Sequence, residues 1–208
     1  MKILFYGDSI TDMGRSREYD GKAFGYGVGY VNFVAGDLLY KDPEAYTILD
    51  RGISGNRIVD LYARIKADVW NLEPDVLSIL IGVNDIWHEI GGQNGVDIKR
   101  WEKVYRMLLE DTLERLPNLK IIICEPFVLE NEAIADIYPR LVGVKEYAAV
   151  AKKLAEEYKL TFVPLQAALD KAAENGRGKY YLYDGVHPDA AGARLIANEW
   201  LKAFNNLQ

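Results

Sequence analysis

The sequence of 208 residues contains a single cysteine and only two histidines. One cysteine cannot form an internal disulfide, and it excludes every metal or redox motif that needs a Cys-x-x-Cys pair. This residue, Cys124, ends the apolar run of residues 120–124, so we expect a buried structural thiol there and not a nucleophile. A zinc hydrolase of the HExxH type is also excluded, because His88 has no second histidine four residues after it.

Clusters of basic charge and long hydrophobic runs are missing as well. The formal net charge is -6, and no group of basic residues with interleaved aromatics offers a surface for phosphate backbones or anionic lipids. No stretch approaches the roughly eighteen uninterrupted apolar residues that a membrane span requires. The chain opens directly on a strand pattern, residues 1–5, without the features of a secretory signal. We therefore expect a cytoplasmic protein that binds neither nucleic acid nor membranes.

The motifs of two other α/β protein classes are absent. Residues 25–29 read Gly-Tyr-Gly-Val-Gly, which lacks the GxGxxG spacing and does not leave a strand directly, and no GxxxxGK[ST] loop occurs. This argues against a nucleotide-binding domain of the flavodoxin type. The GxSxG elbow of the α/β-hydrolases is also missing.

What the sequence does contain is a regular alternation of strand and helix patterns. Apolar, β-branched runs predict five buried strands, at residues 2–6, 46–49, 76–81, 120–124 and 161–163. Apolar residues recurring at three and four predict six helices, at residues 29–40, 58–71, 99–116, 140–158, 165–175 and 189–204. Parallel strands need crossover connections, which place helices outside the sheet. We expect one domain, residues 1–208, folded as a three-layer α/β/α sandwich with a five-stranded parallel sheet. Two polar, glycine-rich connections, 12–28 and 86–96, are predicted as long loops that shape a site.

Chemistry-bearing residues follow the ends of the first three predicted strands. Ser9 lies in Gly-Asp-Ser-Ile-Thr directly after the first strand, Gly55 follows the second and Asn84 the third. In an open α/β sheet, ligands bind beyond the carboxyl ends of the strands, where the strand order reverses. If the order is 2-1-3-4-5, these three residues converge on one small volume.

A serine nucleophile needs a base held in the right tautomer, and the chain supplies one candidate near its end. His187 lies three residues after Asp184 on a turn that contains glycine and proline, so the carboxylate is close enough to orient the imidazole. In isolation this pair also fits a surface histidine before the last helix. Its occurrence together with Ser9, Gly55 and Asn84 favours a catalytic role.

Acyl transfer also needs hydrogen-bond donors aimed at the oxygen that becomes negative. The Gly55 backbone N–H can approach closely because glycine has no Cβ, and the Asn84 side-chain amide donates without carrying charge. The N–H of Ser9 is a third donor. Taken singly, Gly55 could be an ordinary turn glycine and Asn84 an ordinary helix cap. The prediction of an oxyanion hole therefore rests on their joint occurrence at strand ends.

These segments together resemble the SGNH hydrolases, also called the GDSL family of esterases and lipases, over nearly the whole chain. The resemblance implies a flavodoxin-like sheet, Ser9 as nucleophile, Asp184 and His187 as acid and base, and an oxyanion hole of Ser9, Gly55 and Asn84. The first block reads GDSIT in place of GDSL, which does not touch the reacting atoms. No metal or organic cofactor is implied.

Finer features resemble the bacterial intracellular acetylxylan esterases of this superfamily. They are the segments 7–12, 24–25 with 29–31, 51–56 and 82–87. This similarity implies removal of acetyl groups from short xylo-oligosaccharides or related acetylated sugars, and assembly into a homo-oligomer. Asp8 and Trp87 are expected to bind substrate, Trp87 by closing a short acyl pocket, although a core position fits Trp87 equally well.

Two alternatives remain open from the sequence. The same motifs serve lysophospholipases and thioesterases, which take longer acyl chains. A non-catalytic carbohydrate-binding relative is a second possibility, against which the intact set of Ser9, Asp184 and His187 argues.

Overall fold

The computed structural model describes residues 1–207 and contains a five-stranded parallel sheet. Its strands are β1 (Lys2–Gly7), β2 (Thr47–Gly52), β3 (Val76–Leu80), β4 (Lys120–Cys124) and β5 (Thr161–Val163). They are ordered β2-β1-β3-β4-β5, and every neighbouring pair is parallel. The predicted strands and the assumed order are both confirmed. The order reverses at β1, because the chain crosses first to β2 on one side and then to β3 on the other.

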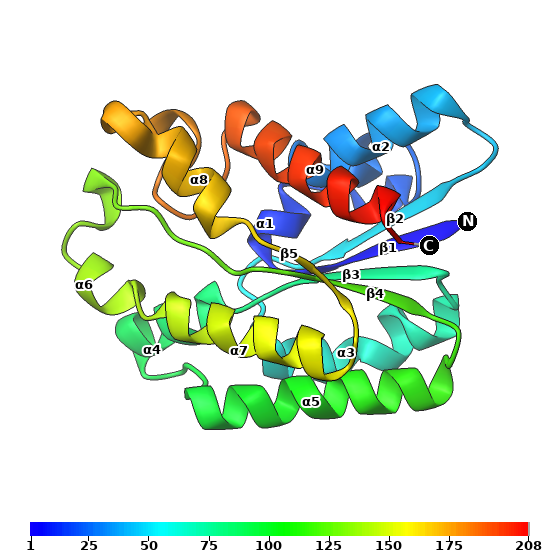
Figure 1. The fold of residues 1–208 in the computed structure, drawn as a ribbon, viewed down its shortest axis with the longest axis horizontal. Helices are drawn as coiled ribbons and strands as arrows, with labels where there is room; N and C mark the ends of the chain where they lie inside the picture. Colours follow the sequence, from blue (N-terminus) through cyan, green and yellow to red (C-terminus); the bar gives the residue numbers. More distant parts are fainter. Residues whose placement is uncertain (208) are drawn as a thin grey trace.

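Helices cover both faces of the sheet (Figure 1). One face carries α1 (Ser9–Asp12), α2 (Tyr30–Lys41), α8 (Gln166–Ala173) and α9 (Ala190–Asn205). The other carries α3 (Ile58–Asp68), α5 (Ile98–Arg115) and α7 (Val144–Glu157), while α4 (Val83–Gly92) and α6 (Tyr138–Leu141) lie toward the carboxyl ends of the strands. Short 3₁₀ turns occur at Arg17–Tyr19, Ala23–Tyr26, Trp70–Leu72, Glu132–Ile134, Glu174–Gly176 and Gly178–Tyr180.

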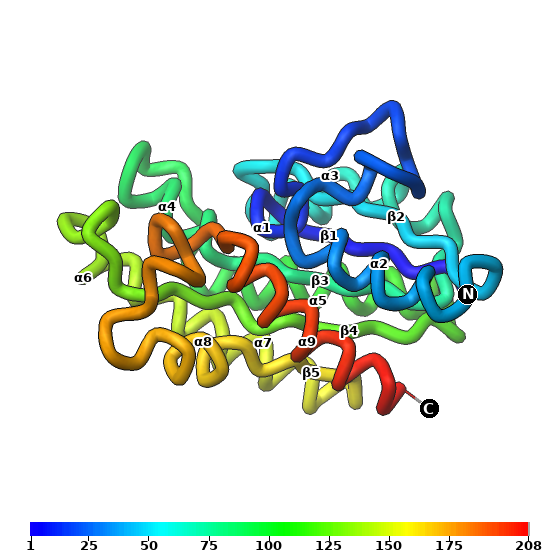
Figure 2. The backbone as a smooth tube through the Cα atoms, turned by 90° about the horizontal axis from the view of Figure 1, so that it is seen from above, coloured from blue at the N-terminus to red at the C-terminus, as the bar shows by residue number. Residues whose placement is uncertain are grey.

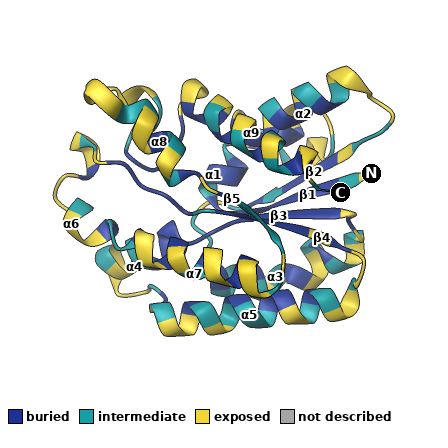
Figure 3. Cartoon of the chain, viewed as in Figure 1, coloured by how far each residue is buried: buried dark blue, intermediate teal, exposed yellow. Residues whose placement is uncertain are grey.

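Two hydrophobic cores separate the three layers. Side chains alternate along β1, so Ile3 and Phe5 pack toward α2 and α9, while Leu4 and Tyr6 pack toward α3 and α5. All four are fully buried, and Figure 3 shows the central strands buried throughout. A parallel sheet with helices on both faces excludes water from both, which confirms the predicted three-layer sandwich.

Cys124 at the end of β4 is buried, as expected for a structural thiol. Its Sγ lies 3.6 Å from the Ser78 Oγ of β3. Burial raises the pKa of Cys124 to about 12, so the reactive thiolate is suppressed.

The prediction of a loop at 86–96 is wrong over most of its length. The chain there forms α4, which continues through Gly92 and ends where Gln93 adopts a left-handed conformation with φ 53°. Val83, Ile86 and Ile90 recur at helical spacing and pack on the hydrophobic core. This packing outweighs the poor helix propensity of the glycines, which had favoured a loop.

The predicted helix at 140–158 is divided. Gly143 donates to the Arg140 carbonyl in a tight 3.1 Å turn, and this separates α6 from α7. The connection 12–28 is long, as predicted, and contains two 3₁₀ turns.

The carboxyl ends of β1, β2 and β3 lie side by side, with Gly7 in register with Gly52 and with Leu80. Gly52 permits this, because a Cβ there would lie 2.2 Å from the Asp12 amide nitrogen of α1. The N-terminus and the last turn of α9 lie at the opposite end of the sheet (Figures 1 and 2). Across residues 1–207, no helix is long and apolar enough to cross a bilayer.

Candidate active site

Ser9 is the first residue of α1 and follows directly on β1. Asp8 precedes it as the N-cap, and its Oδ1 accepts a hydrogen bond from the Ile10 amide at 2.9 Å. The cap fixes where the strand stops and the helix starts, because it satisfies an amide that has no partner within the helix. The Ser9 side chain is therefore presented from a rigid turn at the carboxyl edge of the sheet.

Asp184 builds the turn that carries His187. Its Oδ1 accepts from the amides of Val186 and His187 at 3.0 and 2.7 Å, while its Oδ2 lies 2.6 Å from the imidazole Nδ1 of His187. Gly185 takes a φ of 87° within this turn. One carboxylate thus shapes the backbone and orients the ring, which explains the three-residue spacing of the pair.

The serine and the imidazole meet although 178 residues separate them. The Ser9 Oγ lies 2.8 Å from the Nε2 of His187. With Asp184 on Nδ1, the three side chains form a continuous hydrogen-bonded series. This is the geometry in which a neutral imidazole can take a proton from a serine hydroxyl.

The charges of this pair reinforce each other. Burial by itself lowers the pKa of His187, but the hydrogen bond and the negative charge of Asp184 raise it above its ordinary value of 6.5. For Asp184, burial raises the pKa, yet hydrogen bonds from the His187 ring and from the turn amides hold it below its usual 3.8. Asp184 is therefore a carboxylate at neutral pH and stabilises the imidazolium.

Gly55 follows the end of β2 and Asn84 follows the end of β3, and a hydrogen bond ties Asn84 to the loop that carries Gly55. The Asn84 Nδ2 donates to the backbone carbonyl of Asn56 at 3.1 Å. One amide hydrogen is thereby used to hold the side chain beside the Gly55 loop, and the second has no hydrogen-bond partner among residues 1–207. Gly55 has a φ of 82°, a conformation that other residues rarely adopt.

Aromatic side chains border His187. The Trp87 ring centroid lies 6.1 Å from the imidazole, and the same side chain packs against the hydrophobic core, so its role toward substrate stays a prediction. Tyr183 stacks on the same ring at 5.8 Å with an interplanar angle of 19°, and it is 55% exposed. Sequence reasoning missed Tyr183, although its position directly before Asp184 was an available signal.

His88 also lies at the site, which the sequence did not indicate. A Cβ on Gly55 would lie 3.9 Å from the His88 Cε1, so the imidazole borders the Gly55 loop. His88 and Gly55 are 33 residues apart in the sequence, and no local pattern links them.

The placement of Asp8 argues against direct contact with substrate. Its exposure is 1%, its Oδ1 caps α1, and its Oδ2 has no hydrogen-bond partner among residues 1–207. Burial raises the pKa of Asp8 to about 7. We expected a substrate-binding residue from its position beside Ser9, but the side chain turns inward beneath the nucleophile.

Known proteins share this fold and sequence. A model of the GDSL-like lipase/acylhydrolase family matches residues 5–195. The chain belongs to this family. An acetylxylan esterase from Geobacillus stearothermophilus is 36% identical to it over 208 residues, 97% of this chain and 92% of that protein.

Solved structures of this GDSL-like family agree closely with the fold. A protein from Parabacteroides merdae named as a GDSL-like lipase superposes with a TM-score of 0.90 at 42% identity, over 98% of this chain and 95% of that one. A variant of Axe2, an acetyl-xylooligosaccharide esterase from Geobacillus stearothermophilus, gives a TM-score of 0.87 at 36% identity, over 97% and 93%. The protein is therefore a GDSL esterase that resembles acetylxylan esterases.

Proposed function

We propose that this esterase removes O-acetyl groups from short xylo-oligosaccharides or related acetylated sugars. The observation that supports ester hydrolysis is the hydrogen-bonded series of Asp184, His187 and Ser9. The Asp184 Oδ2 lies 2.6 Å from the His187 Nδ1, and the His187 Nε2 lies 2.8 Å from the Ser9 Oγ. Support for the substrate comes from the 36% identity to an acetylxylan esterase over nearly the full length of both chains.

The proposed reaction has two steps. The Ser9 Oγ attacks the acetyl carbonyl while the Nε2 of His187 takes the hydroxyl proton, and Asp184 stabilises the imidazolium. The imidazolium then gives that proton to the departing sugar oxygen as the ester bond breaks, which leaves an acetyl-serine. In the second step His187 takes a proton from water, the resulting attack releases acetate, and the proton returns to the Ser9 oxygen.

Each step passes through a tetrahedral intermediate with a negative oxygen. We assign its donors to the N–H groups of Ser9 and Gly55 and to the free amide hydrogen of Asn84. These groups come from the adjacent ends of β1, β2 and β3. The sheet therefore holds them in place before the charge develops, and no donor has to reorganise during the reaction.

The aromatic residues beside His187 favour a small acyl group. Trp87 and Tyr183 both lie within about 6 Å of the imidazole ring, centroid to centroid. Their bulk leaves less room for a long acyl chain beside Ser9, and the exposed face of Tyr183 suits packing against a sugar ring.

Acetate release tests the proposed substrate. Acetylated xylo-oligosaccharides should yield acetate, and p-nitrophenyl acetate should be cleaved at least about tenfold faster than p-nitrophenyl octanoate, because a closed pocket rejects added methylenes. The comparison is made by kcat/KM on the same preparation. Preferred octanoate cleavage would assign the protein to lysophospholipase or thioesterase chemistry, and inactivity on every ester would support the carbohydrate-binding alternative.

Replacing Asn84 by alanine should lower kcat about 100- to 1,000-fold with little change in KM, because the donor acts on the transition state. Steady-state kinetics on p-nitrophenyl acetate measure both constants. Asn32→Ala, on the exterior helix α2, is the matched control and should stay close to the wild type. A rise in KM alone would make Asn84 a binding residue and would contradict its place in the oxyanion hole.

The cytoplasmic location and the homo-oligomer both remain predictions. The fold does not test the location. The homo-oligomer is supported by exposed aromatic side chains, among them Phe24, Tyr40 and Tyr180 at 70%, 93% and 60% exposure, which suit subunit contacts.

A further inference from the structure

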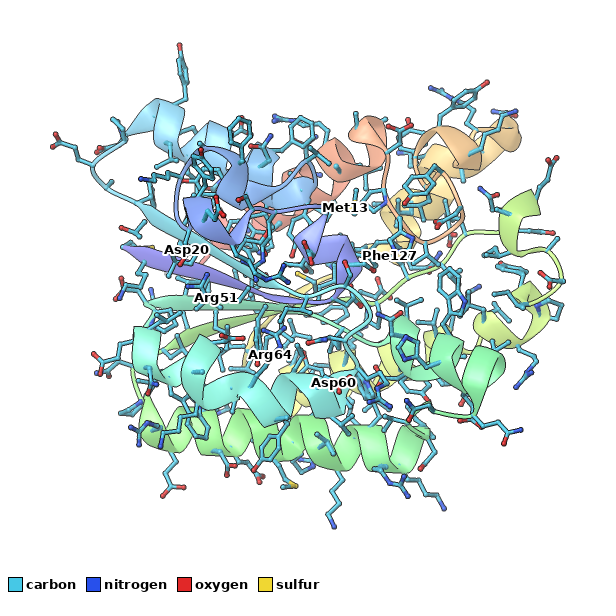
Figure 4. The ribbon with its side chains drawn as sticks, turned by 180° about the vertical axis from the view of Figure 1, so that it is seen from behind. Met13, Asp20, Arg51, Asp60, Arg64 and Phe127 are labelled. Atoms are coloured by element: carbon cyan, nitrogen blue, oxygen red, sulfur yellow. The ribbon has the colours of Figure 1, made fainter. Side chains whose placement is uncertain are left out.

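Arg64, on α3, forms hydrogen bonds with the segments on both sides of the oxyanion hole. Its Nε donates to the side-chain Oδ1 of Asn56 at 2.8 Å, in the loop that carries Gly55. Its Nη2 donates to the backbone carbonyl of Gly7 at 3.1 Å, two residues before Ser9. Figure 4 shows Arg64 between α3 and the sheet.

The two segments that Arg64 joins also contact each other and Asn84. The Gly7 carbonyl accepts a second hydrogen bond, from the Ile53 amide at 3.1 Å. The backbone carbonyl of Asn56, whose side chain Arg64 holds, accepts the Asn84 amide at 3.1 Å. The nucleophile turn, the Gly55 loop and Asn84 are thus connected through Arg64 and Asn56.

The guanidinium itself is fixed from two further directions. Its Nη1 pairs with Asp68, one turn later on α3, and its Cζ lies 4.4 Å from the ring centroid of Tyr6 on β1. The Arg64 side chain is only 16% exposed. A planar guanidinium can serve three acceptors and stack on an aromatic ring at once, which a lysine ammonium on a flexible stem cannot reproduce.

We propose that Arg64 is a positioning residue that holds the Gly55 loop and the Asn84 amide in register with Ser9. It touches neither the reacting atoms nor substrate in this role, and it acts through Asn56 and the Gly7 carbonyl. The inference rests on the oxyanion-hole assignment proposed above. A displacement of about 1 Å in such a donor can cost on the order of 100-fold in rate.

The first test is Arg64→Leu, which keeps apolar bulk over Tyr6 and removes every hydrogen bond. We expect kcat on p-nitrophenyl acetate to fall about 10- to 100-fold, with KM within about twofold, because only the transition state uses the oxyanion donors. Arg64→Lys should have a kcat above that of Arg64→Leu but at most about a third of the wild-type kcat, since one ammonium group cannot replace the several planar donors of the guanidinium.

Arg106→Leu is the matched control. Arg106 also lies over an aromatic ring, Tyr158, and pairs with Glu102 and Glu157, but on α5 and remote from Ser9. This substitution removes the same kinds of contact and should leave kcat unchanged. Thermal unfolding of both variants shows whether each remains folded at the assay temperature.

A double-mutant cycle with Asn84→Ala separates positioning from general destabilisation. If Arg64 acts through the Asn84 donor, Arg64→Leu should cost much less in the Asn84→Ala background than in the wild type. Full additivity would overturn the proposal, and so would a folded Arg64→Leu variant with wild-type kcat.

If Arg64→Leu does not fold, a further variant, Asn56→Ala, tests the same proposal. Asn56→Ala keeps the carbonyl that Asn84 uses but removes the side chain that Arg64 holds, so it should also lower kcat, and an unchanged kcat would overturn the proposal. A failure of the Arg64 proposal can be distinguished from a failure of the oxyanion-hole assignment on which it rests. If Asn84→Ala alone costs nothing, the oxyanion assignment fails, whereas the sugar substrate is judged separately by acetate release.

Discussion

Replacing Ser9 with alanine is expected to reduce kcat/KM by about ten-thousand-fold or more. The variant has no oxygen to attack the acetyl carbonyl, so only water activated by His187 or by solvent remains. Hydrolysis of p-nitrophenyl acetate and of acetylated xylo-oligosaccharides should fall together. Stability should change little, within about 0.5 kcal/mol, because Ser9 is partly exposed and its Oγ contacts the half-buried His187 ring.

The control for Ser9→Ala is Ser16→Ala. Ser16 precedes the first 3₁₀ turn and its side chain makes no capping hydrogen bond there, so the loss of this hydroxyl should leave activity close to the wild type. A covalent test complements the kinetics: a fluorophosphonate should transfer its phosphonyl group to Ser9 with loss of fluoride, so the wild type should gain the mass of that group and Ser9→Ala should not. A Ser9→Ala variant that kept more than a few per cent of activity would remove Ser9 from the mechanism.

The second large effect is expected for Asp184→Asn, at about ten-thousand-fold in kcat. An asparagine amide can donate to Nδ1, which favours the tautomer with its proton on Nε2, the atom that must accept from Ser9. The neutral amide also cannot stabilise the imidazolium. The backbone of the turn should be retained, because the amide oxygen can still accept from Val186 and His187.

The same substitution should move the acid limb of the pH profile. In the wild type the carboxylate raises the pKa of His187 above 6.5, so protonation inactivates the base at a correspondingly higher pH. Asp184→Asn removes that charge, and the limb in kcat/KM should shift to lower pH. Asp8 adds a smaller effect of the same sign on His187.

An NMR titration measures the pKa of the His187 imidazole directly, without contributions from other groups to the pH profile. The chain has two histidines, so the imidazole signals in an NMR titration can be assigned with a His88→Gln variant. Asp189→Asn, at the exposed cap of α9, is the control and should leave the His187 titration unchanged. An unaltered acid limb in Asp184→Asn would show that the charge of Asp184 does not set the basicity of His187.

Parts of the site could be predicted because their geometry is local. Asp184 and His187 are three residues apart, and one carboxylate binds the turn amides and the ring. Their spacing made a contact between them predictable, and the accompanying Ser9, Gly55 and Asn84 favoured a catalytic role. The position of Ser9 after β1 is local in the same sense. The roles of Gly55 and Asn84 rest on donor chemistry and on their positions after two predicted strands, and the family resemblance implies the same roles. The structure places them after β2 and β3, on either side of β1.

Other parts depended on packing that no window of sequence contains. The glycines at 91 and 92 favoured a loop, but apolar residues of α4 pack against the core and extend the helix. Asp8 is next to Ser9 in the chain, yet its side chain is buried and its Oδ1 caps α1. The contacts of Arg64 with Gly7 and Asn56 arise from the path of α3 under the sheet.

The sequence by itself determined the five strands, the parallel sheet, the serine at a strand end and the acid-base turn, since each follows from periodicity or from contacts within a few residues. Only the tertiary structure decided how closely those groups meet and which further side chains border them. It brings the His187 Nε2 to 2.8 Å from the Ser9 Oγ across 178 residues, and it places Tyr183 and His88 at the site. Such long-range contacts depend on how the layers pack, because adjacency in a folded sheet is set by strand order and not by distance along the chain.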